Sequence, residues 1–298
     1  MEFEKKKLDR RSFLLGSADL GGFILGCLGP LRINLSEFTK SPPRRTIPLD
    51  QNGSYTFISI GDSLAAGWGG INNAQGVPES WVGPMVAQLN TVRQRHTRQP
   101  TAGSSSSYRD WQYVSNFLLS EAGLTSGGLL DKMQSPDVIH SLETPNQAVL
   151  CVSLGFNDID DFRTGTVLDF LMLHTKLDSY QQNLQSIIEK FKIARTGKED
   201  YATCILLGLP NLDEVPAVTK AVRGTLLEGR AGLIAKEVNQ RMVAVCNSSV
   251  DISMAYVDLF NHSSIPKSLF SSDGLHPNGP GYEQIGAIAA QTVDIMVE

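Results

Sequence analysis

Residues 147–154 read QAVLCVSL, a short run that is almost entirely apolar. Such a run is typical of a strand that is buried on both faces of a parallel sheet. Four more short runs are rich in β-branched, aromatic and other apolar residues: 55–60 (YTFISI), 111–118 (WQYVSNFL), 202–209 (ATCILLGL) and 252–259 (ISMAYVDL). We therefore predict five strands in one parallel sheet.

Longer stretches with helical periodicity separate these runs. Leu177, Tyr180, Leu184 and Ile188, for example, recur at intervals of three or four residues, as on one face of a helix. The predicted helices cover residues 79–95, 126–133, 166–195, 217–246 and 279–296. Strands that alternate with helices form βαβ units, so helices should cover both faces of the sheet. In such an α/β fold, ligands bind beyond the carboxyl ends of the strands.

The composition favours one large domain and excludes some functions. Hydrophobic residues make up 41% of the 298 residues and charged residues 19%, enough for a sizeable core. The net charge of -5 argues against a nucleic-acid partner, which would require a basic patch. The four cysteines, at positions 27, 151, 204 and 246, form no CxxC pair and have no histidine beside them at zinc-ligand spacing. We expect neither a metal nor a cofactor.

Residues 1–31 are expected to form an export signal. A basic stretch that contains Arg10 and Arg11 precedes a short, glycine-rich apolar stretch, which is the layout of such signals. The arginine pair resembles a twin-arginine signal, and the residues before Cys27 resemble a lipobox. A lipid on Cys27 would tether the protein to a membrane. The alternative is an uncleaved basic leader.

Residues 32–54 contain prolines and turn formers without periodicity, which predicts a linker. The globular domain is then expected to span residues 55–298. The export signal predicts a bacterial protein that is periplasmic, extracellular or, if lipidated, membrane-anchored.

Polar residues directly follow two of the predicted strands. Ser63 follows the first strand, next to Gly61, and a serine at such a turn is well placed to act as a nucleophile. Its alternative role is that of a helix N-cap. Asn157 follows the strand at 147–154, where its amide could donate to a developing oxyanion or merely form an Asx-turn.

Another polar pair lies near the C-terminus. Asp273 and His276 are three residues apart, with Gly274 between them. The carboxylate can therefore accept a hydrogen bond from one imidazole nitrogen and leave the other free as a base. A lone Asp–His pair in a loop is more often merely solvated. Asn278 and Pro280 indicate that the last helix begins just after this pair and holds the loop in place.

In combination, these motifs resemble those of the SGNH (GDSL) hydrolase family. GDSL at residues 61–64, GFND at 155–158 and DGLHP at 273–277 occur in the family's order, and the resemblance extends over residues 55–296. It implies a flavodoxin-like three-layer α/β/α sandwich around the five-stranded parallel sheet. It also implies hydrolysis of esters or thioesters without a metal.

The resemblance also implies roles for single residues. Ser63 would be the nucleophile, His276 the general base and Asp273 the acid that orients the base. The Ser63 and Gly123 backbone amides and the Asn157 side chain would form the oxyanion hole.

The glycine of the oxyanion hole is assigned by its position in the chain. Gly123 follows a predicted strand and precedes a predicted helix, and Gly103 is its rival. Glu121 places a charge where the family usually has small residues.

The expected substrate is a small-molecule ester: a lipid, a lysophospholipid or an acylated carbohydrate. The reaction would proceed through an acyl-enzyme intermediate. An acyltransferase that uses the same residues and a binding protein with an inactive site are the alternatives. The complete set of polar residues weighs against an inactive site, because a buried polar group without a task lowers stability.

Overall fold

A computed structural model describes eleven parts of the chain: residues 46–51, 53–70, 80–97, 110–143, 145, 147–159, 167–197, 202–225, 227–249, 251–262 and 266–296. The predicted export signal, the lipobox at Cys27 and the alternative glycine Gly103 lie outside these residues and stay predictions. No helix in these eleven parts is long and apolar enough to span a bilayer.

Five parallel strands form the central sheet in the order β3-β2-β4-β5-β6. They are β2 (Tyr55–Gly61), β3 (Gln112–Ser120), β4 (Gln147–Ser153), β5 (Thr203–Leu207) and β6 (Ser253–Val257). Every pair of neighbouring strands is parallel. The predicted five-stranded parallel sheet is therefore confirmed.

The sheet is buried on both faces, and β4 shows why its sequence is almost wholly apolar. Leu150 and Val152 belong to the hydrophobic cluster on one face, whereas Val149 and Cys151 belong to the cluster on the other. Successive side chains of a strand point to opposite faces. Burial of each large aliphatic side chain stabilises the fold by about 1.5–3 kcal/mol. Because β4 buries such side chains on both faces, packing on each side of the sheet stabilises this strand.

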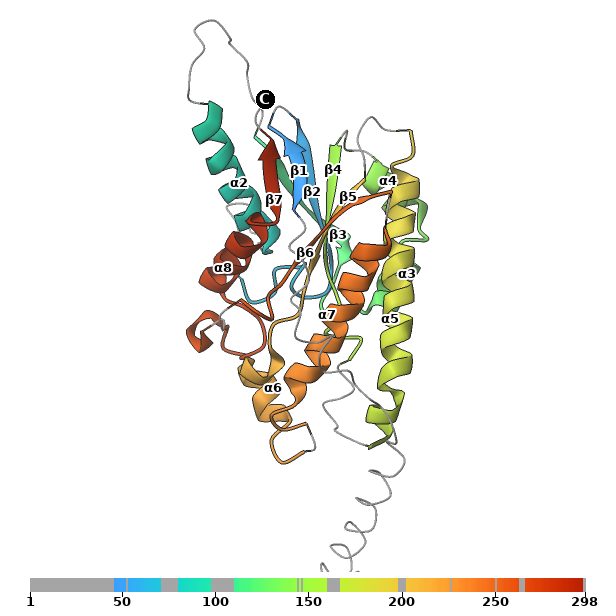
Figure 1. Ribbon diagram of the computed structural model, residues 1–298, viewed down its shortest axis with the longest axis vertical. Helices are drawn as coiled ribbons and strands as arrows, with labels where there is room; N and C mark the ends of the chain where they lie inside the picture. Colours follow the sequence, from blue (N-terminus) through green and yellow to red (C-terminus); the bar gives the residue numbers. More distant parts are fainter. Residues whose placement is uncertain are drawn as a thin grey trace, which may run out of the picture. The chain divides into compact units, whose positions relative to one another are not determined.

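Helices cover both faces of the sheet, which confirms the three-layer α/β/α fold (Figure 1). One face is covered by α2 (Val82–Thr97) and α8 (Gly279–Ala290). The other is covered by α3 (Ser126–Lys132), α4 (Pro136–Glu143), α5 (Val167–Ala194) and α7 (Ala231–Ser248).

The prediction of a single helix over residues 217–246 is wrong, because the chain forms two helices there. A short α6 (Pro216–Ala221) is followed by turns and then by α7. Asp213 accepts hydrogen bonds from the Ala231 and Gly232 amides at 3.0 and 3.1 Å. A carboxylate at this position satisfies free amides of the first helical turn, so α7 begins at Ala231.

Two further differences concern the ends of the domain. Residues 47–50, predicted as part of the linker, form β1 (Ile47–Asp50), whose Ile47 and Leu49 side chains are buried. The last helix ends at Ala290, and β7 (Val293–Met296) follows and pairs with β1 in parallel. Each of these strands finds its partner at the other end of the domain, which no local pattern could reveal. The domain thus begins before residue 55.

Candidate active site

Ser63 lies in the turns that follow β2, at the carboxyl edge of the sheet. The strand β2 pairs with β3 on one side and β4 on the other, so Ser63 is flanked by the connections that follow both. The Ala66 amide donates to the Asp62 carbonyl at 3.0 Å and the Trp68 amide to the Ser63 carbonyl at 2.9 Å. These bonds hold Ser63 in a tight, half-buried turn.

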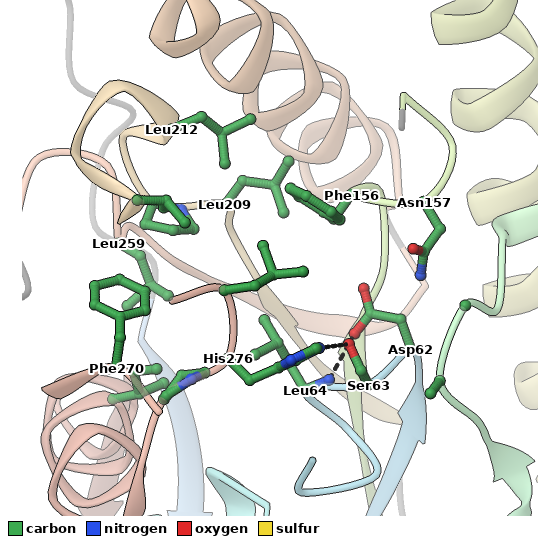
Figure 2. A pocket seen from close by; sticks show the side chains of 17 residues that line it. Asp62, Ser63, Leu64, Phe156, Asn157, Leu209, Leu212, Leu259, Phe270 and His276 are labelled. Carbon is green, nitrogen blue, oxygen red and sulfur yellow. Dashed lines mark hydrogen bonds between the residues drawn. The ribbon is translucent and has the colours of Figure 1, made fainter. Parts of the chain in front are cut away.

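His276 comes from the loop between the short 3-10 helix η3 (Lys267–Leu269) and α8, and it meets Ser63 across the site. Its Nε2 lies 2.9 Å from the Ser63 Oγ (Figure 2). Its Nδ1 lies 2.6 Å from the Asp273 Oδ2. The Asn278 side chain accepts from the Gly281 amide and caps α8, as predicted. The loop thus brings two of the predicted residues to the third.

The electrostatics of Asp273 decide which imidazole nitrogen carries the proton. Burial alone would raise the pKa of Asp273, but hydrogen bonds from His276, the Ser271 hydroxyl and the amides of His276 and Leu275 hold it well below its usual range. An ionised carboxylate can only accept hydrogen bonds. The His276 Nδ1 must therefore donate, which leaves the lone pair of Nε2 directed at the Ser63 hydroxyl.

The predicted oxyanion-hole residues Gly123 and Asn157 line the same cavity as Ser63 and His276. Gly123 lies in the turn after β3 with a φ of +82°, a conformation that glycine adopts far more readily than other residues. A Cβ at Gly123 would meet no atom within 4 Å. Glycine is thus needed there for its backbone conformation and not for lack of space.

Two contacts tie the Gly123 turn to the turn that follows β4. The Asn157 Nδ2 donates to the Leu124 carbonyl at 3.1 Å, and the Asp158 carboxylate accepts from the Ser126 amide at 3.0 Å. Burial raises the pKa of Asp158. Glu121 forms an exposed ion pair with Lys132 at 2.7 Å and does not line the cavity.

Asp62 is a site residue whose role the sequence reasoning missed. Its side chain is buried, and its Oδ1 accepts from the Leu64 amide at 3.0 Å and from the Ser153 hydroxyl at 2.9 Å. These bonds fasten the turn that carries Ser63 to the end of β4. Burial raises the pKa of Asp62 to about 7. Its place directly before Ser63, at the end of a buried strand, was the available signal.

Because Asp62 is buried, we predict that the stability of the fold depends on pH, and that Asp62→Asn removes this dependence. The pKa of Asp62 in the folded protein lies above the unfolded value of about 3.9, so its ionisation destabilises the fold as the pH rises through that interval. Relative to Asp62→Asn, which keeps the acceptor oxygen, the wild type should lose on the order of 2–3 kcal/mol of unfolding free energy between about pH 5 and pH 8.

Urea denaturation of both proteins at the two pH values measures this difference. Asp294→Asn, at an exposed position of β7, is the control and should follow the wild type. Parallel pH curves for wild type and Asp62→Asn would contradict the prediction.

Beside Ser63 and His276 lies a cavity of about 150 Å³ whose walls are largely apolar (Figure 2). Its walls come from several connections between strands and helices, with side chains such as Phe156, Leu209, Leu212, Val215, Leu259 and Leu275. Figure 2 shows Leu209, Leu212 and Phe156 around the space next to the Ser63–His276 pair. Polar side chains are confined to the end where Ser63, Asn157 and His276 meet.

Comparison with known proteins identifies the family. The model of the GDSL-like Lipase/Acylhydrolase family matches residues 57–288. No curated protein gives a significant sequence match.

The fold is also found in solved structures. A lipase from a goat rumen metagenome has a TM-score of 0.57 at 16% identity, with 82% of this chain and 97% of that chain covered. A single-residue variant of an acetyl-xylooligosaccharide esterase from Geobacillus stearmophilus has a TM-score of 0.51 at 15% identity, with 81% and 94% covered. The family match spans most of the chain and includes each predicted site residue. The chain belongs to the GDSL-like lipase/acylhydrolase family of carboxylic ester hydrolases.

Proposed function

We propose that the protein hydrolyses esters of aliphatic carboxylic acids through an acyl-enzyme intermediate on Ser63. The observation that carries this proposal is the hydrogen-bonded series Asp273–His276–Ser63 at the polar end of an apolar cavity. Each residue has a role that follows from its neighbours.

In the first half of the reaction, the His276 Nε2 takes the Ser63 proton as the Oγ attacks the acyl carbon. The ionised Asp273 stabilises the imidazolium that forms. The negative charge on the carbonyl oxygen is stabilised by the Ser63 and Gly123 amides and by the Asn157 amide. When the ester bond breaks, His276 returns the proton to the leaving alcohol.

In the second half, His276 takes a proton from water, whose oxygen attacks the acyl carbon. The tetrahedral intermediate uses the same oxyanion donors. Its collapse breaks the bond to the Ser63 Oγ, which regains a proton from His276, and the carboxylic acid is released.

The cavity indicates the size of the acyl group. Its volume is about 150 Å³, and an engineered protein cavity of about 150 Å³ lined by similar side chains binds benzene. An acyl chain of about four to eight carbons fits this space. We therefore propose medium-length aliphatic acyl groups as substrates.

A panel of p-nitrophenyl esters from acetate to dodecanoate tests this proposal. We expect kcat/KM to rise from acetate to a maximum at about four to eight carbons and to fall beyond it. Leu212→Trp, which fills the cavity, should lower kcat/KM for hexanoate by about tenfold or more.

Hydrolysis of acetate by Leu212→Trp is the internal control for folding and should be nearly unchanged. A maximum at acetate in the wild type, or equal losses on acetate and hexanoate in the variant, would overturn the assignment of the cavity to the acyl group.

A further inference from the structure

Trp68 is a large aromatic side chain that the proposed mechanism does not use. It is 56% exposed, whereas the other two tryptophans, Trp81 and Trp111, are 0% and 2% exposed. Its ring centroid lies 6.2 Å from that of His276, with the two rings tilted by 55°. Trp68 is not among the residues that line the acyl cavity. The exposed indole thus lies beside His276 but outside the acyl cavity.

The backbone of Trp68 is fixed although its side chain is exposed. Its amide donates to the Ser63 carbonyl, and its carbonyl accepts from the hydroxyl of Tyr282 on α8, each at 2.9 Å. The next residue, Gly69, has a φ of +81°, and a Cβ there would come within 3.0 Å of the His276 Cβ. The fold therefore holds the backbone of Trp68 and Gly69 close against the loop that carries His276, and the indole lies beside the imidazole.

The position of the leaving group follows from the proposed proton transfer. His276 Nε2 donates a proton to the leaving oxygen, so this oxygen must lie within hydrogen-bond reach of Nε2. The acyl chain occupies the apolar cavity, and the carbonyl oxygen faces Gly123 and Asn157. In the bound ester, the alcohol part must then extend out of the site on the remaining side, past His276, where Trp68 lies.

We propose that Trp68 stacks on a ring in the alcohol part of the substrate and so favours esters of cyclic alcohols. Aromatic rings stack or meet edge to face at centroid separations of about 4.5–7 Å, and the exposed indole beside His276 has a flat apolar face that a substrate ring could approach at this separation. The ring could belong to a sugar or to an aromatic alcohol, which share a flat face that carries C–H groups or π electrons. The inference rests on the proposed acyl-enzyme mechanism.

The test compares three esters of one acid: ethyl hexanoate, phenyl hexanoate and methyl glucoside 6-O-hexanoate. Trp68→Ala should lower kcat/KM by about 3- to 10-fold for an ester whose ring stacks, and by less than about twofold for ethyl hexanoate. Trp68→Phe should recover part of the loss. Ile193→Ala on α5, where the side chain is 63% exposed, is the matched control and should change none of the three.

The three esters form the same hexanoyl-enzyme, which separates a leaving-group contact from an effect on His276. His276 acts in acylation and in deacylation, whereas the alcohol has gone before deacylation begins. Loss of the hexanoyl group from Ser63, followed by mass spectrometry after rapid quenching, should be equally fast in wild type and Trp68→Ala. A slower deacylation in the variant would show that Trp68 acts through His276 and would overturn the proposal.

Fluorescence provides a readout that does not depend on turnover. Trp68 is the one exposed tryptophan, so acrylamide quenching reports on it selectively. In Ser63→Ala, a saturating ring-bearing ester should reduce the quenching, and ethyl hexanoate should not. Protection by the glucoside ester alone identifies a sugar, and protection by the phenyl ester alone an aromatic alcohol. Equal losses of kcat/KM on all three esters in Trp68→Ala would overturn the proposal, and so would the absence of protection from quenching by both ring-bearing esters. A wild type that hydrolyses none of the three esters would instead refute the proposed function.

Discussion

Ser63→Ala is expected to lower kcat for ester hydrolysis on the order of 10⁴–10⁶-fold. In the proposed mechanism His276 deprotonates this hydroxyl, which lies 2.9 Å from its Nε2, and alanine offers no atom that could form the acyl-enzyme. His276→Ala should cause a loss of similar size, because nucleophile and base act as a unit. The double variant should lose little more than either single variant.

Steady-state kinetics with p-nitrophenyl hexanoate measure these losses. Ser186→Ala, at an exposed serine of α5 whose hydroxyl donates to the Gln182 carbonyl, is the control and should retain wild-type activity. Losses that add up fully in the double variant would argue that Ser63 and His276 act independently, contrary to the proposed mechanism.

The second large effect is expected at the oxyanion hole. Asn157→Ala should lower kcat on the order of 10²–10³-fold, the usual loss for one such donor, with little change in KM. The donors stabilise the charge of the transition state more than the neutral carbonyl, so substrate binding is largely spared. Gly123→Ala should also lower kcat, because a φ of +82° disfavours alanine and the amide would turn away.

Gly197 provides a matched control for Gly123. It has a φ of +83°, and a Cβ there would also meet no atom within 4 Å, but it follows α5 and does not line the cavity. Gly197→Ala should therefore share the backbone strain without the loss of kcat, as kinetics and thermal denaturation of both variants would show. Equal kcat in the two variants would remove Gly123 from the oxyanion hole, and a damaging Gly103→Ala would favour the alternative glycine.

The strands of the central sheet could be predicted from the sequence because their burial leaves a local pattern. β4 alternates between two hydrophobic clusters, so all its positions from Ala148 to Val152 are apolar and the strand is recognisable without its partners. Ser63 and Asn157 could be found for a related reason. Both follow such strands directly, and the parallel topology brings the strand ends together.

Elements that depend on distant partners left no such pattern. β1 and β7 are only four residues long. From the sequence they are assigned to a linker and to the end of a helix, and their mutual pairing makes them strands. The division between α6 and α7 depends on the Asp213 carboxylate at the start of α7. Gly224 and Gly229 in the break adopt a positive φ, so here the sequence also carries a local signal, which the prediction of one helix does not use.

The cavity could not be predicted from the sequence either. Leu209 and Leu212 come from the connection that follows β5, Leu259 from the one that follows β6, and Leu275 from the loop before α8. Each is an ordinary apolar residue in its own segment. Their meeting beside Ser63 is a consequence of the strand order. The same holds for Asp62, whose burial depends on Ser153 at the end of the neighbouring strand.

Covalent labelling tests the central claim, that Ser63 is an activated nucleophile, most directly. The native protein is treated with an alkyl fluorophosphonate, which transfers its phosphonyl group to an activated serine with loss of fluoride, and the product is digested and mapped by mass spectrometry. We predict one phosphonyl group per chain on the Ser63 hydroxyl, no labelling of Ser63→Ala, strongly slowed labelling of His276→Ala, and no effect of EDTA. A label on another serine, or ester hydrolysis that persists in Ser63→Ala and is abolished by EDTA, would contradict the account.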